Sequence, residues 1–146
     1  MYLIRLARPS DAEAIATLLC QLGHPSTPDH VRRQIARVGT NNGMVVLVAE
    51  AESRTVGVLA LQICLQFHQE PPLARIVDLC VLDTHRGSHA GRSLIERAEE
   101  IAREKGCCKL EVTANNVREP AHRFYQLNGL EQTHRYFAKN LQEIAP

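Results

Sequence analysis

The chain has 146 residues, which suits one domain and leaves little room for a second. Its hydrophobic share of 45% is typical of a globular protein with a core, and 17 basic residues nearly balance 16 acidic ones. This balance argues against nucleic acid as the main partner, although it allows a local basic pocket.

The N-terminal sequence and the cysteines indicate the compartment. Met1-Tyr2-Leu3-Ile4-Arg5 does not resemble the start of a signal peptide, and no apolar run approaches membrane-spanning length. We therefore expect a cytoplasmic protein without a membrane partner. The five cysteines are odd in number and irregularly spaced, which favours reduced, buried thiols over a disulfide framework.

The N-terminal half predicts a strand, two helices and a hairpin. Ser10 stands three residues before Glu13, the spacing of a capping box, and Gly23 is a typical helix end. Pro28 favours the start of a second helix, whose outer side carries arginines. In chain order we expect a strand at residues 2–6, helices between Ser10 and Gly23 and from Pro28 to about Val38, and hairpin strands at 44–50 and 55–67.

The C-terminal half begins with a strand that is apolar on both faces and therefore central in the sheet, and Asp78 interrupts it. A loop then leads into a long amphipathic helix that Gly106 ends. The expected elements are a strand at 74–82, a loop at 83–89, a helix to about Lys105, a strand at 109–113, a helix at 120–127 and one or two strands within 130–141. Interleaved helices and hairpins indicate one α/β (α+β) domain over residues 1–146 with a mixed sheet.

The loop between the central strand and the long helix predicts an anion site. Backbone N–H groups at a helix start lack internal partners and lie at the positive end of the helix dipole. An ordinary strand-to-helix turn is the alternative, whereas Walker and Rossmann loops fit poorly. The candidate anion-binding residues are Arg86, Gly87, Ser88, His89, Ala90, Gly91 and Arg92.

Two segments in the same order and separation resemble the GNAT family of N-acetyltransferases. Arg86 and Gly91 match the pyrophosphate loop Gln/Arg-x-x-Gly-x-Gly/Ala, with His89 at the position of the middle glycine. The short helix matches the family's Ala-x-x-Phe-Tyr motif, which ends at Gly-Phe. Its matching residues are Ala121, Phe124, Tyr125 and Gly129, with Leu130 replacing the aromatic residue.

The resemblance implies a GNAT fold, with a mixed and mostly antiparallel sheet of about six to seven strands flanked by about four helices. It also implies acetyl-CoA as co-substrate, bound by the loop residues, by Asn116 and by the exposed backbone of a splayed strand at Leu79, Cys80 and Val81. Tyr125 matches the tyrosine that protonates the leaving thiolate in many relatives. A packing tyrosine is the alternative.

The base that deprotonates the amine has two candidates. Asp78 is a carboxylate on an apolar strand, where burial raises a pKa. His68, after the long strand, belongs to the residue type that titrates near neutral pH. A structural carboxylate and a surface histidine are the respective alternatives. We find no nucleophile triad, so direct transfer is preferred to an acetyl-enzyme.

A closer resemblance is to the bacterial aminoalkylphosphonate N-acetyltransferases. It covers residues 44–141 and includes Leu65-Gln66-Phe67-His68, Ala121–Tyr125 and Glu131–His134. It implies a small primary amine beside an anionic group, which the arginines of the second helix would meet unless they form a solvated face. It also suggests a divalent metal held by His68, His134 and Asp78. Cys20 and His24 alone are too few ligands for a metal site.

Other functions stay open on the sequence alone. A CoA or acetyl-CoA sensor without turnover is one, and an acetyltransferase for a polyamine, an amino acid, an aminoglycoside or a protein N-terminus is another. A nucleotide-binding module is a third class, which tighter binding of ATP or NAD than of CoA would reveal. We expect a homodimer, because relatives often pair through late strands and Leu130, Tyr136 and Phe137 are apolar.

Overall fold

The fold is known from a computed structural model, which describes residues 1–41, 43–113, 119–133 and 137–142. The chain divides into two compact units, residues 1–112 and 113–146. The first contains a sheet with helices on both faces, and the second contains helix α4 (Glu119–Leu127). The expectation of a single domain over the whole chain stays a prediction.

The N-terminal unit is built on a five-stranded sheet with the order β1-β2-β3-β4-β5. The first three pairings are antiparallel and the pairing of β4 with β5 is parallel, so the α/β class and the mixed sheet are confirmed. The elements are β1 (Leu3–Leu6), η1 (Pro9–Asp11), α1 (Ala12–Gln21), α2 (Pro28–Gly39), β2 (Met44–Ala51), β3 (Arg54–Cys64), β4 (Leu73–Val81), η2 (Asp83–His85), α3 (Ala90–Glu104) and β5 (Leu110–Val112).

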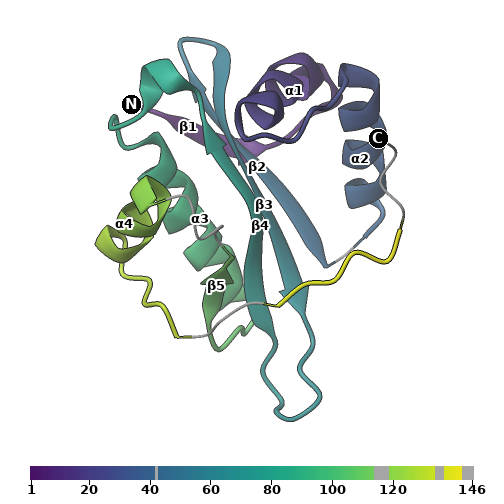
Figure 1. Ribbon diagram of the computed structural model, residues 1–146, viewed down its shortest axis with the longest axis vertical. Coiled ribbons are helices and arrows are strands. Elements are labelled where there is room, and N and C mark those ends of the chain that lie inside the picture. Colours follow the sequence, from purple (N-terminus) through teal and green to yellow (C-terminus); the bar gives the residue numbers. More distant parts are fainter. Residues whose placement is uncertain (42, 114–118, 134–136, 143–146) are drawn as a thin grey trace. The chain divides into compact units, whose positions relative to one another are not determined.

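Helices α1 and α2 cover one face of the sheet and α3 covers the other (Figure 1). The first face buries a cluster that joins Leu18 of α1 and Val31 of α2 to Val48, Val58 and Cys80 of the strands. On the second face Leu94 of α3 lies against β3, where a Cβ added to Gly57 would meet its Cδ1 at 3.2 Å. Burying each large apolar side chain contributes about 1.5–3 kcal/mol, so the two faces together hold the strands in register.

Local signals explain several element boundaries. Thr27 caps α2 by accepting a hydrogen bond from the His30 N–H at 3.1 Å, directly before Pro28. The hairpin of β2 and β3 turns at Glu52 and Ser53, both with positive φ, as a two-residue type I′ turn requires. Among the described residues, no helix is long and apolar enough to cross a membrane.

Two predictions about the N-terminal elements were wrong. No side-chain capping bond links Ser10 and Glu13; Asp11 instead accepts a hydrogen bond from the Arg8 N–H at 2.7 Å. Strand β3 ends at Cys64 rather than Phe67, because its next partners would be Pro72 and Pro71, which have no N–H to donate. The sheet therefore continues no further along this hairpin, and Phe67 is exposed.

The sixth and seventh strands are also missing from the described residues. Residues 130–133 and 137–141 adopt no strand, and Phe137 and Leu141 are almost fully exposed. A strand needs a neighbouring strand to satisfy its backbone N–H and C=O groups, and these described residues pair with none. The predicted strand over residues 130–141 is therefore wrong where the structure describes it.

Candidate functional site

The loop before α3 presents free backbone donors, as the sequence predicted. Within the described part of the chain, the N–H groups of Gly87, His89, Ala90 and Gly91 have no hydrogen-bond acceptor. The first helical bond is donated by Ser93 N–H to the His89 carbonyl oxygen at 2.9 Å. These donors stand at the positive end of a 15-residue helix, which suits a bound anion such as a pyrophosphate.

Two residues of this loop adopt the left-handed backbone conformation. Gly87 has φ +79° and His89 has φ +72°. The left-handed region costs a residue with a Cβ roughly 1–2 kcal/mol, which explains why the family pattern has glycine at the position of His89. His89 therefore adopts a backbone conformation that suits glycine, at an energetic cost.

The side chains of the loop are engaged with their neighbours. Arg86 pairs with Asp83 and Arg92 pairs with Glu96, each at 3.0 Å and in exposed positions. Exposed pairs of this kind contribute about 0–1 kcal/mol, so both guanidinium groups are easily redirected to a phosphate. The Ser88 hydroxyl donates to the His85 carbonyl oxygen, so its proton is used within the loop.

Strand β4 extends beyond its described pairing with β5, where the resemblance implies a splayed strand. Up to residue 113, the parallel pairing covers Ala74–Leu110, Arg75–Glu111 and Ile76–Val112. Next along β4, the pairing with β3 shifts so that Ala60 faces Asp78 and Leu61 faces Ile76. Val77 is thus the extra residue of a β-bulge, which bends the strand at the start of its free edge.

The register shows which backbone groups of β4 face the free edge. Leu82 N–H donates to the Val56 carbonyl oxygen at 2.8 Å, and antiparallel pairs alternate, so Cys80 also bonds toward β3. Leu79 and Val81 face the opposite edge, where the Gln21 side-chain amide donates to the Val81 carbonyl oxygen at 3.4 Å. The register thus narrows the candidate backbone groups from three residues to Leu79 and Val81. Cys80 packs against α1 instead, its thiol donating to the Leu18 carbonyl oxygen.

Asp78 lies half-buried on the face of the sheet that α1 and α2 cover. It is two residues from Cys80 and shares its face. Burial raises the pKa of its carboxyl, and the nearby charge of His24 lowers it part of the way. Within the described residues, no hydrogen bond or ion pair engages this carboxylate. A carboxylate with a raised pKa and unused acceptor capacity is chemically suited to accept a proton.

His24 reaches this position because of how α1 ends. The His24 N–H donates to the Leu19 carbonyl oxygen and the Gly23 N–H to that of Cys20, which is a Schellman motif with Gly23 at φ +93°. Gln21 fixes the same helix end to β4. In the sequence, Gly23 signals only the end of the helix, and no local pattern indicates that His24 is a neighbour of Asp78.

His68 does not lie beside Asp78. It is exposed in the loop after β3, beyond Cys64, whereas Asp78 pairs with Ala60. Four strand positions separate Ala60 from Cys64, a span of about 13 Å at 3.3 Å per residue. The described residues contain no group of three or more metal-ligating side chains, and His134 lies outside them.

Tyr125 belongs to α4 of the second unit. Its half-buried ring packs edge-on against Phe124, with centroids 5.7 Å apart. The helix ends in a Schellman motif, in which Leu130 N–H donates to the Tyr125 carbonyl oxygen and Gly129 has φ +85°. The predicted short helix and its stop are thus confirmed, while the role of Tyr125 stays a prediction. Asn116 lies outside the described residues.

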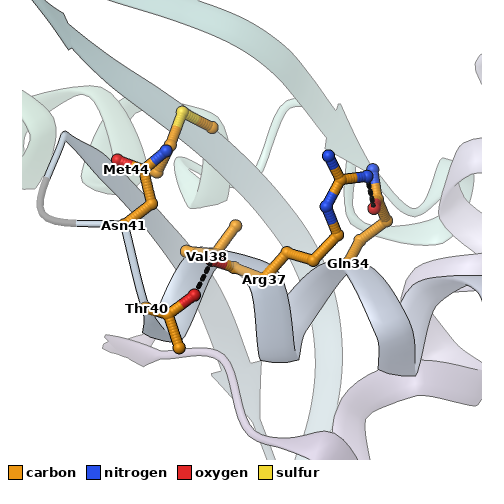
Figure 2. A pocket seen from close by; sticks show the side chains of 6 residues that line it. All are labelled: Gln34, Arg37, Val38, Thr40, Asn41 and Met44. Carbon is orange, nitrogen blue, oxygen red and sulfur yellow. Dashed lines mark hydrogen bonds between the residues drawn. The ribbon is translucent and has the colours of Figure 1, made fainter.

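The arginines of α2 are divided between two surroundings. Arg32 pairs with Asp29 at 2.7 Å and with Glu13 at 3.8 Å. Arg37 lines an open cavity of about 600 Å³ and donates to the Gln34 side chain at 3.0 Å (Figure 2). The other residues that line this cavity are Val38, Thr40, Asn41 and Met44. Figure 2 shows the Arg37 guanidinium turned toward Gln34 and away from Met44.

The cysteines differ in their exposure. Cys80 is buried as predicted, but Cys20 and Cys108 are exposed, so the expectation of buried thiols was wrong for these two. Cys64 and Cys107 are half-buried, and burial together with the neighbouring thiols raises the pKa of Cys107. None of these thiols belongs to the loop or to the free edge of β4.

Comparison with known proteins decides the family. Residues 12–130 match the acetyltransferase (GNAT) family, which covers both units. The chain belongs to this family. It is therefore an acetyl-CoA-dependent N-acetyltransferase, and the free donors before α3 and the splayed edge of β4 fit a CoA co-substrate.

Individual proteins are similar to this GNAT protein in sequence or in fold. It is 29% identical over 143 residues to the aminoalkylphosphonate N-acetyltransferase of Salmonella typhimurium, covering 94% of this chain and 90% of the relative. Among solved structures, a protein described as a transcriptional regulator from Bacillus halodurans has a TM-score of 0.88 at 23% identity, covering 97% of this chain and 100% of that chain. An aminoglycoside acetyltransferase from an uncultured soil sample has a TM-score of 0.81 at 26% identity, covering 97% of both chains.

Proposed function

We propose that this GNAT protein acetylates a small primary amine that carries a neighbouring anionic group, with an aminoalkylphosphonate as the substrate class. One observation carries the proposal: Asp78, a half-buried carboxylate with no bonding partner in the described residues, adjoins the free edge of β4 and has His24 nearby. The similarity to an aminoalkylphosphonate N-acetyltransferase along almost the whole chain supports the choice of anion.

The proposed reaction assigns the chemistry to groups of this chain. Asp78 accepts a proton from the acceptor ammonium, and the free amine then attacks the thioester carbonyl carbon. A C–N bond forms as the C–S bond breaks, and the Leu79 N–H at the free edge of β4 donates to the oxygen on which negative charge develops. Tyr125, assigned from the family motif, protonates the departing thiolate. The loop donors before α3 hold the pyrophosphate of CoA.

Two groups near the same face of the sheet can recognise the charges of the acceptor. His24 interacts with Asp78 electrostatically, yet the two side chains form no ion pair within 4.0 Å. A zwitterionic acceptor between them would pair its ammonium with Asp78 and its anion with His24. Arg37 is a weaker candidate for the anion, because its guanidinium already bonds Gln34.

Thiol release from acetyl-CoA tests the proposal against matched acceptors. The set comprises an aminoalkylphosphonate, the aminoalkyl carboxylate of the same length and the alkylamine without an acid group, with a polyamine and an amino acid as further amines. We expect kcat/KM for the phosphonate to exceed that for the plain amine by about 10-fold or more, because a charge-assisted hydrogen bond from the exposed His24 contributes roughly 1.5–3 kcal/mol. Equal turnover of phosphonate and plain amine would contradict it.

An aminoglycoside acceptor is the second candidate, and a specific observation favours it. The soil-sample aminoglycoside acetyltransferase shares the fold over nearly the full length at 26% identity. Aminoglycosides are polycations, so their recognition needs several carboxylates rather than one beside a histidine. Preferential turnover of an aminoglycoside in the same assay would select this candidate.

Three further expectations remain part of the proposal. The family match extends over both units, which supports a single functional domain. A homodimer is expected, and light scattering that gives only the monomer mass across concentrations would reject it. We also propose a cytoplasmic location, which accords with the family.

A further inference from the structure

A ring of hydrogen bonds links Tyr2, near the N-terminus, to His85 and Ser88 in the loop before α3. Tyr2 directly precedes β1. Its hydroxyl lies 3.1 Å from His85 Nδ1 and also contacts Ser88 Oγ. These partners are 83 and 86 residues away in the sequence. The Tyr2 and His85 rings meet edge-on, with centroids 6.0 Å apart. The N-terminal strand is thus tied to the loop by polar and aromatic contacts.

Counting protons fixes the direction of every bond in this ring. The Ser88 hydroxyl donates to the His85 carbonyl oxygen, which can only accept, so Ser88 has no proton left for Tyr2. Tyr2 must therefore donate its own proton to Ser88 Oγ. Its oxygen can then only accept from His85, which must carry a proton on Nδ1.

The ring of hydrogen bonds stabilises a backbone conformation of the loop that is costly to form. The same loop contains His89 at φ +72° and Gly87 at φ +79°, on either side of Ser88. A histidine in the left-handed region is disfavoured unless the surrounding structure holds it there. The free N–H groups of Gly87, His89 and Ala90 belong to this strained turn, so fixing it organises the donors before CoA arrives.

We propose that Tyr2 is a positioning residue for CoA binding, acting through the His85–Ser88 ring to hold the pyrophosphate loop in its binding conformation. Tyr2 does not contact the reacting atoms in this proposal. The inference concerns the CoA side of the enzyme and is independent of the acceptor, so binding of CoA alone tests it.

The decisive experiment is calorimetric titration of CoA into the full chain with Tyr2→Phe. Phenylalanine keeps the ring contact with His85 and removes only the hydroxyl. Losing one to two hydrogen bonds that organise a loop predicts a Kd about three- to ten-fold weaker. In turnover assays the KM for acetyl-CoA rises by a similar factor, while kcat and the KM of the acceptor stay unchanged. A Kd equal to that of the wild type would overturn the proposal.

Two further variants separate loop positioning from general loosening of β1. Leu3→Ala removes an exposed apolar side chain from the first residue of β1, next to Tyr2, without changing the Tyr2–His85–Ser88 hydrogen bonds, and its Kd should match the wild type. A Leu3→Ala loss as large as that of Tyr2→Phe would overturn the proposal. His89→Gly relieves the left-handed strain, so Tyr2→Phe/His89→Gly should recover much of the lost affinity. No recovery in the double variant counts against loop strain as the link.

The proton count gives a spectroscopic signature that a merely structural tyrosine would not. Nitrogen NMR of the His85 ring should show the Nδ1–H form in the wild type at a pH where the ring is neutral. In Tyr2→Phe the resonance should move toward the Nε2–H form that is commoner in solution. A wild-type ring already protonated only at Nε2 would overturn the bond directions and with them the proposal. If Tyr2→Phe folds poorly, Ser88→Ala removes the hydroxyl to which Tyr2 donates and serves the same test.

Discussion

Asp11 and Asp78 are two buried or half-buried aspartates of the N-terminal unit with opposite surroundings. Asp11 is only 5% exposed and accepts two hydrogen bonds from the Arg5 guanidinium, at 2.8 and 2.9 Å. The Arg8 N–H and the Thr55 hydroxyl donate to it as well, each at 2.7 Å. Burial alone would raise its pKa, but these donors lower the pKa of Asp11 to about 2.

Asp78 is half-buried, but no described residue donates a hydrogen bond to its carboxylate. Its pKa is raised by burial, and the nearby charge of His24 opposes that rise. The comparison shows that burial does not decide what a carboxylate does, because Asp11 is the more buried of the two. A structural carboxylate has its acceptor capacity filled by the fold, while a reactive one is left with capacity for a ligand.

Replacing Asp78 gives the largest expected effect. Asp78→Asn removes the base, and general-base catalysis contributes typically 10²–10⁴-fold, so kcat/KM should fall by about 100-fold or more. The free energy of unfolding should stay the same or rise, because an amide avoids the cost of burying a charge. Steady-state kinetics and urea unfolding measure the two quantities. Asp29→Asn, an exposed carboxylate on α2, is the matched control.

The opposite pattern would remove Asp78 from the reaction. If Asp78→Asn keeps full turnover and instead loses stability, the carboxylate is structural like Asp11. Unchanged binding of CoA by the variant would show that the loop before α3 is intact, so a loss of turnover is assigned to the acceptor side.

Replacing Asp11 should reverse the outcome. Asp11→Asn leaves the Arg5 charge with 14% side-chain exposure and one fewer partner, which should cost about 3 kcal/mol of unfolding free energy at pH 7. The folded fraction should retain the wild-type kcat, since Asp11 lies in the network of β1, η1 and β3. Full stability of this variant would contradict the assignment.

The pH dependence of Asp11 follows from the lowered pKa. The unfolded carboxyl titrates near 3.8 and the folded one at about 2, so the folded state binds fewer protons between these values. The stabilisation is therefore complete above about pH 4 and is lost as the pH falls through 2. The difference in unfolding free energy between wild type and Asp11→Asn should shrink over that interval, measured by urea titration at several pH values.

Local chemistry explains which parts of this molecule could be predicted from the sequence. Gly23, Pro28 and Asn128-Gly129 act on the backbone within a few residues, and the helix boundaries they predicted agree with the structure to within two residues. The loop before α3 was predicted for the same reason, since unpaired N–H groups belong to any helix start. The left-handed backbone at His89 was implied only by the family's glycine at that position.

What the sequence did not reveal depends on pairing between distant residues. The bulge at Val77 and the division of backbone groups between Leu79 and Cys80 arise from the register of β3 and β4. The end of β3 was misplaced because its apolar run continues, while its partners at Pro71 and Pro72 cannot bond. The proximity of His24 to Asp78 could not be predicted for a similar reason: only the fold shows that the end of α1 lies near Asp78.

Replacing His24 gives the smallest effect and tests the electrostatic side of the comparison. His24 lowers the pKa of Asp78 against burial, so His24→Gln should let that pKa rise further. Asp78 must be ionised to accept a proton, and the acid limb of the kcat/KM profile should therefore move to higher pH. Partly exposed charge pairs contribute about 0.2–1 kcal/mol, so activity on the acid side should fall roughly two- to five-fold.

Other charges near Asp78 determine how this result is interpreted. Arg75 of β4 and Glu111 of β5 lie on the same face and form an ion pair with each other at 2.5 Å, and Lys109 also pairs with Glu111. His30→Gln makes the same chemical change on the exposed start of α2 and should leave the profile in place. A shift of the acid limb in His24→Gln toward lower pH would mean that His24 does not stabilise the ionised carboxylate. An unchanged limb, together with a higher KM for the anionic acceptor alone, would instead assign His24 to the acceptor's anion and leave the pKa of Asp78 to burial.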